Sequence, residues 1–64
     1  MQLSDIRKNK HYTQQYVADQ IGIEQSAVAM WESGKSTPST KNLLRLAEVL
    51  DVSLDDLVAA LPKT

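Results

Sequence analysis

The chain has 64 residues, a formal net charge of -1 and 42% hydrophobic residues, so we expect one small domain, residues 1–64, with a modest core. It has no cysteine and a single histidine, which excludes disulfide bonds and zinc sites built from nitrogen and sulfur ligands. No apolar run approaches the ~20 residues of a membrane span and no secretory signal precedes the first polar residues, so we expect a cytoplasmic protein without a membrane partner.

Three helices are predicted in the first half of the chain. Thr13 occupies the N-cap position of the second helix, where its hydroxyl can accept a free backbone N–H. Gly22 ends that helix and Gly34 ends the third, because glycine adopts the left-handed conformation without a Cβ clash. The apolar residues that recur at helical spacing on the inner faces are Leu3 and Ile6, then Val17, Ala18 and Ile21, then Ala27, Val28 and Trp31.

Two further helices follow a break at Pro38, which cannot continue a helix. Ser39 or Thr40 caps the fourth helix, Ser53 caps the fifth, and Pro62 ends it. The residues expected to face inward are Leu43, Leu44, Leu46, Ala47 and Leu50, then Leu54, Leu57, Val58 and Leu61. Strand signals are absent, so the sequence predicts an all-α domain of five helices.

The second and third helices are separated only by a short turn that begins at Gly22. Such a turn sets two helices at a steep angle, as in a helix-turn-helix unit, where the second helix enters the DNA major groove. A packing corner in a small bundle would give the same pattern. The turn alone leaves both interpretations open.

The outward face of the third helix carries no charge, although solvated helix faces are normally rich in Glu, Lys and Arg. Its residues are Gln25, Ser26, Ala29, Met30 and Ser33. Amide, hydroxyl and methyl groups suit close approach to base edges, since Gln binds adenine in a bidentate manner and apolar groups touch the thymine methyl. A tolerant surface and a contact with a partner protein are the alternatives.

The charge is divided unevenly along the chain. Residues 1–45 carry six cations and four anions, a balance of +2, whereas residues 46–64 carry one cation and four anions, a balance of -3. An overall balance of -1 is unusual for a nucleic-acid binder. The first two-thirds of the chain could nevertheless face a polyanion, with the acidic end turned away.

Several runs together resemble the phage-repressor and Cro-type (XRE-like) helix-turn-helix family. They are Thr13-Gln14-Gln15-Tyr16-Val17-Ala18, Ile21-Gly22-Ile23, Trp31-Glu32-Ser33-Gly34-Lys35, Pro38-Ser39 and Leu46-Ala47. The resemblance implies a compact five-helix, lambda-repressor-like domain. It further implies a bacterial or phage protein that binds double-stranded operator DNA, usually as a homodimer, and represses transcription without a cofactor or a small-molecule ligand.

The resemblance also assigns residues by position. The implied base contacts are Gln14, Gln25, Ser26, Ala29 and Met30. The implied phosphate contacts are Gln14, Arg7, Ser33, Lys35, Ser36, Thr37 and Lys41. Arg7 and Glu32 are implied to form an ion pair between the first and third helices. Two departures stand out: Met30 cannot donate a hydrogen bond, and Glu24 replaces the usual Ser or Thr as a weak cap of the third helix.

Dimer contacts are expected from the fifth helix, at Leu54, Val58 and Leu61, together with Met1, unless the same leucines simply close the core. Two rival functions stay open. The fold could serve as a protein-interaction module, such as an antirepressor or antitoxin, or it could be the DNA-binding domain of a longer regulator. Because the chain starts with Met1 and has no trailing linker, we expect that it is not a domain excised from a longer regulator. We expect no enzymatic role, because the sequence has no glycine-rich phosphate loop and a Ser–His–Asp site would need a cleft that so small a bundle can hardly form.

Overall fold

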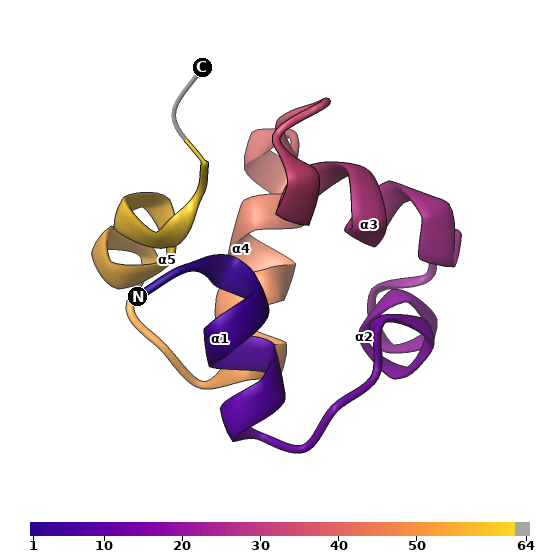
Figure 1. The fold of residues 1–64 in the computed structure, drawn as a ribbon, viewed down its shortest axis with the longest axis horizontal. Helices are drawn as coiled ribbons and strands as arrows, with labels where there is room; N and C mark the ends of the chain where they lie inside the picture. The colour runs from indigo at the N-terminus through magenta and orange to yellow at the C-terminus, as the bar shows by residue number, and fades with distance from the viewer. Residues whose placement is uncertain (63–64) are drawn as a thin grey trace.

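The computed structural model describes residues 1–62 and folds them into five α-helices with no strand. The helices are α1 (Leu3–Asn9), α2 (Gln14–Ile21), α3 (Gln25–Ser33), α4 (Thr40–Leu50) and α5 (Leu54–Ala60). The helix α4 packs against α2 on one side and against α5 on the other, and α3 packs on α2 (Figure 1). The predicted all-α fold is confirmed. No helix in residues 1–62 is long and apolar enough to cross a membrane.

The helix ends lie where local chemistry predicts them. The Thr13 hydroxyl accepts the Tyr16 N–H at 3.0 Å, and the Ser53 hydroxyl accepts the Asp56 N–H at 3.1 Å. For α4 the cap is Ser39, whose hydroxyl accepts a backbone N–H at 3.3 Å. Gly22 and Gly34 end α2 and α3 with φ of 87° and 84°, the left-handed region that favours glycine.

One apolar core lies where the inner faces of all five helices meet. Its buried members are Leu3, Ile6, Val17, Ala18, Ile21, Val28, Trp31, Leu46, Leu50, Leu57 and Ala60. The inward prediction is wrong for three residues: Leu44 is 50% exposed, Leu54 40% and Val58 52%. Both α4 and α5 bury a narrower stripe than predicted, because each covers the bundle with one side only.

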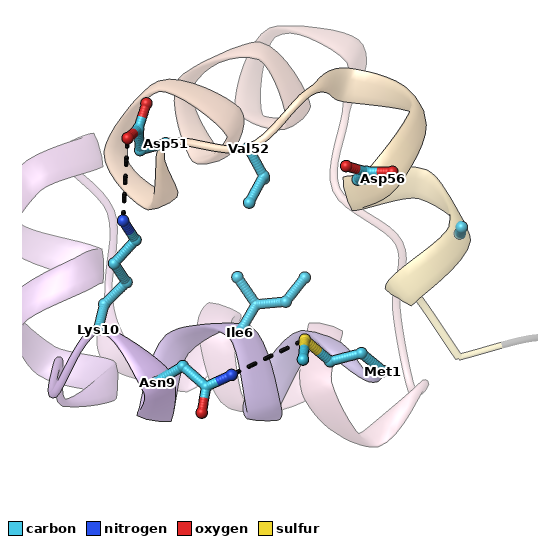
Figure 2. A pocket seen from close by; sticks show the side chains of 8 residues that line it. Met1, Ile6, Asn9, Lys10, Asp51, Val52 and Asp56 are labelled. Carbon is cyan, nitrogen blue, oxygen red and sulfur yellow. Dashed lines mark hydrogen bonds and ion pairs between the residues drawn. The ribbon is translucent and has the colours of Figure 1, made fainter.

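A pocket of about 470 Å³ opens between α1 and the turn that joins α4 to α5. Figure 2 shows Ile6 of α1 and Val52 of the turn extending toward each other across it. Lys10 Nζ lies 3.9 Å from Asp51 Oδ2 at one edge. The pocket is lined by none of the residues implied to contact DNA.

Candidate nucleic-acid interface

The turn between α2 and α3 is a tight helix end built on Gly22. The backbone N–H groups of Gly22 and Ile23 both donate to the Ala18 carbonyl oxygen, at 2.8 and 3.0 Å. Ala18 itself is fully buried, and α3 packs on α2. As expected of a weak cap, the Glu24 side chain makes no capping hydrogen bond to α3.

The outer face of α3 stands free of the bundle. Gln25, Ser26 and Ser33 are exposed, Met30 is 41% exposed, and Ala29 is half-buried. The opposite face is anchored in the core by Val28 and Trp31. The Ser33 hydroxyl donates to the Met30 carbonyl oxygen at 3.1 Å, so it keeps only its acceptor capacity for a partner. The uncharged face predicted from the sequence is therefore a real, accessible surface.

A chain of hydrogen bonds runs from α1 to this surface through α3 and α2. Arg7 Nε donates to Glu32 Oε2 at 2.6 Å, and Arg7 Nη2 donates to Glu32 Oε1 at 3.1 Å. Gln14 Nε2 donates to the same Oε1 at 2.9 Å. Gln25 Nε2 then donates to Gln14 Oε1 at 2.6 Å. The chain connects the buried ion pair with the exposed start of α3.

The ion pair is shielded from water, with 11% of the Arg7 side chain and 8% of the Glu32 side chain exposed. Burial by itself raises the pKa of Glu32, but hydrogen bonds from Arg7 and Gln14 and the Arg7 charge outweigh it, so this pKa lies below its ordinary value. The hydrogen bond to Glu32 raises the pKa of Arg7. Both groups are therefore charged near neutral pH.

Arg7 has little capacity left for a phosphate. Besides its two bonds to Glu32, its Nη1 donates to the Tyr12 carbonyl oxygen at 2.9 Å. Three of the five N–H groups of the guanidinium are thus used inside the protein. The main role of Arg7 in this structure is to join α1 to α3 and to the segment before α2.

The remaining residues implied to contact phosphate lie around the end of α3 and the start of α4. Lys35, Thr37 and Lys41 are exposed, and Ser36 is half-buried. The Lys35 N–H donates to the Met30 carbonyl oxygen at 3.0 Å, which fixes the loop against the end of α3. Lys35, Ser36 and Thr37 thus follow the uncharged face of α3 directly along the chain, whereas Lys41 lies in the first turn of α4.

Two features were not found from the sequence. Arg45 Nη1 donates to the Ile21 carbonyl oxygen at 2.9 Å and so ties α4 to the end of α2. The rings of Tyr12 and Tyr16 pack with their centroids 4.6 Å apart. The Arg45 contact has no local sequence signal, because the approach of α4 to α2 depends on how the helices cross. Tyr12 and Tyr16, by contrast, are four residues apart across the start of α2, so their spacing in the sequence is a local signal for that contact.

These elements define a helix-turn-helix domain: two helices at a tight glycine turn, with the second presenting a free polar face. Residues 3–57 match the sequence model of the family described as Helix-turn-helix. The chain belongs to this helix-turn-helix family.

Relatives of known sequence and structure agree with this assignment. The chain is 41% identical over 56 residues to the HTH-type transcriptional regulator AnsR of Bacillus subtilis (strain 168), covering 88% of this chain and 48% of AnsR. It is 38% identical over 55 residues to the cryptic phage CTXphi transcriptional repressor RstR of Vibrio cholerae, covering 86% of this chain and 49% of RstR. The chain thus spans about half the length of these curated relatives.

Two solved structures resemble the fold. The N-terminal DNA binding domain of SinR from Bacillus subtilis has a TM-score of 0.78 and 32% identity, covering 86% of this chain and 81% of that one. A transcriptional regulator from Listeria innocua has a TM-score of 0.82 and 27% identity, covering 97% of this chain and 58% of that one.

Proposed function

We propose that this protein binds double-stranded DNA in a sequence-specific manner and regulates transcription, as a repressor, without enzymatic activity. The observation that carries the proposal is the accessible, uncharged outer face of α3, braced by α2 across the Gly22 turn. The names of relatives support it, since they include a transcriptional regulator and a phage repressor. A protein that binds DNA acts in the compartment that holds the DNA, which is the cytoplasm in a bacterium.

In this proposal α3 lies in the major groove and α2 crosses the backbone. Gln25 and Ser26, at the exposed start of α3, contact base edges through hydrogen bonds. Ala29 and Met30 provide apolar contacts to thymine methyl groups, and Gln14 supports Gln25 from α2. Sequence preference therefore comes from few polar groups.

Affinity comes chiefly from phosphate contacts, which fix register but carry no sequence information. Lys35 and Lys41 supply charge, while Ser33, Ser36 and Thr37 supply hydroxyl groups. Two cations per monomer give modest affinity. A dimer that binds two half-sites at once compensates for the modest affinity of each monomer.

We propose that α5 contributes the dimer contact. Leu54 and Val58 are 40% and 52% exposed, and Leu61 is partly buried. A spacing of four residues places Leu54 and Val58 on one side of α5, and Leu61 follows directly after the last residue of that helix. Val58→Glu should leave the monomer folded and raise the protein concentration at which dimers form, as measured by sedimentation equilibrium with and without duplex. An unchanged dimerisation constant would exclude this surface.

The function is tested by selecting duplexes from a random DNA pool and titrating the selected site at several salt concentrations. Counterion release gives a slope of log affinity against log salt of about -0.9 per phosphate contact. We expect roughly -2 per monomer from Lys35 and Lys41. A protein-interaction module would enrich no sequence, and that result would overturn the proposal.

Two matched variants separate the roles of the contact residues. Lys35→Ala should weaken all duplexes about equally and lower the salt slope by roughly one unit. Gln25→Ala should relax the preference at a single base pair by ~1–3 kcal/mol. If every base preference survived in Gln25→Ala, the assignment of the recognition face would be wrong.

A further inference from the structure

The hydrogen-bond chain that ends at Gln25 has a direction. A glutamine amide has an acceptor oxygen at one side and a donor NH₂ at the other, and it can turn either way in principle. An ionised carboxylate, by contrast, can only accept. The group at the buried end of the chain, Glu32, therefore decides how the amides beyond it are turned.

The direction follows step by step from the distances. Glu32 Oε1 lies 2.9 Å from Gln14 Nε2, so Gln14 must turn its NH₂ toward Glu32. Its Oε1 is then left to face Gln25 and accepts from Gln25 Nε2 at 2.6 Å. Gln25 therefore keeps its own Oε1 and one N–H for a partner outside the protein.

Glu32 is held in place firmly enough to impose this order. Its side chain is 8% exposed, and Arg7 fixes the carboxylate through both Nε and Nη2. Arg7 is fixed in turn by the Tyr12 carbonyl oxygen. The carboxylate cannot rotate away without leaving a buried guanidinium unpaired, which is costly.

We propose that Glu32 is a positioning residue for base recognition: through Gln14 it orients the Gln25 amide so that α3 favours adenine over guanine at one base pair. The proposal rests on the function proposed above. Adenine offers an N6 donor and an N7 acceptor, which match one amide oxygen and one amide N–H. Guanine offers two acceptors, O6 and N7, so the Gln25 oxygen would face O6 without a proton between them.

The sharpest test is Glu32→Gln, which keeps the shape of the side chain. The new amide oxygen stays with the Arg7 guanidinium, because that hydrogen bond is charge-assisted. The oxygen takes the Oε2 position opposite Arg7 Nε, and the new NH₂ takes the Oε1 position, where the hydrogen bond from Arg7 Nη2 is lost. This NH₂ faces Gln14, which turns around, and Gln25 turns with it. Gln25 now presents N–H groups outward, and these suit guanine.

The measurement is the affinity of a selected duplex and of the same duplex with guanine in place of the adenine that Gln25 reads. Gln25→Ala identifies that position. We expect the unaltered protein to prefer adenine at least about tenfold. In Glu32→Gln the ratio should fall to about one or reverse. A ratio unchanged within about twofold would overturn the proposal.

Gln14→Met is the matched control, because it removes both amide hydrogen bonds and leaves the ion pair intact. In the Gln14→Met background, Glu32→Gln should produce no further change in the adenine-to-guanine ratio. A second change of the same size would mean that Glu32 acts through overall structure and not through Gln14. Should Glu32→Gln fail to fold, Gln14→Met alone must lower the ratio, and an unaltered ratio would reject the inference.

A readout without DNA separates this inference from the proposed function. In NMR spectra of the free protein at neutral pH, a Gln25 side-chain amide proton should shift upfield in Gln14→Met, because it loses its acceptor. An unmoved signal would overturn the proposed orientation even if DNA binding were established. If no duplex were selected by the unaltered protein, the proposed function itself would fail, while a moving signal would still support the hydrogen-bond order.

Discussion

Glu32→Ala should destabilise this domain far more than the loss of an ordinary surface charge. The variant removes the acceptor of two Arg7 hydrogen bonds and the acceptor of Gln14. It leaves the Arg7 guanidinium, 11% exposed, with only the Tyr12 carbonyl oxygen as a partner. Breaking a buried pair by removing one partner costs ~3–5 kcal/mol.

That cost is comparable to the whole stability a core of this size usually supplies, ~3–5 kcal/mol. We therefore expect Glu32→Ala to be largely unfolded at 25 °C. Urea titration followed by circular dichroism and by the fluorescence of Trp31, which is buried in the core, measures the change. A free energy of unfolding within about 1 kcal/mol of the unaltered protein would refute this reasoning, since that is the most an exposed pair usually contributes.

Two controls isolate the cause. Lys10→Ala removes the exposed pair with Asp51, whose atoms lie 3.9 Å apart with the Asp51 side chain 91% exposed, and should cost ~0–1 kcal/mol. The double variant Arg7→Met with Glu32→Leu removes both charges together. It should be less destabilising than Glu32→Ala alone, because no unpaired buried charge remains.

Three further predictions concern pH and the helix ends. The folded-state pKa of Glu32 is below its ordinary value of 4.5, so the pair contributes its stability in full above pH 4.5 and loses it as pH falls through the folded-state pKa. In Glu32→Gln the urea midpoint should therefore depend less on pH across that range. An equal loss of stability in acid in the variant would contradict this. Gly22→Ala should lower the free energy of unfolding by ~1–2 kcal/mol because of its left-handed φ alone. Gly34→Ala should lower it further, since the new Cβ would also lie 3.1 Å from the Pro62 Cβ. A smaller loss in Gly34→Ala than in Gly22→Ala, measured by urea titration, would exclude the Pro62 contact. Thr13→Ala should lower the free energy of unfolding by ~1 kcal/mol through loss of the α2 cap, and Thr13→Ser should restore most of it.

The candidate DNA-contacting surface was only partly accessible from the sequence. The uncharged face of α3 was visible from residue spacing, and the pair of Arg7 and Glu32 was implied by the family resemblance. The link from Glu32 through Gln14 to Gln25 was not visible in the sequence, because Glu32 is 18 positions from Gln14 and Gln14 is 11 positions from Gln25. Whether these residues contact DNA stays a prediction.

The sequence by itself determined the number of helices and where most of them begin and end. Capping hydroxyls such as Thr13 and left-handed glycines such as Gly22 act on backbone groups within a few residues, so their effect is local. Only the tertiary structure decided which apolar residues are covered, as at Leu44 and Val58, and which polar groups meet across helices. Those outcomes depend on the angles and distances at which helices pack, and these arise from all the contacts of the core together.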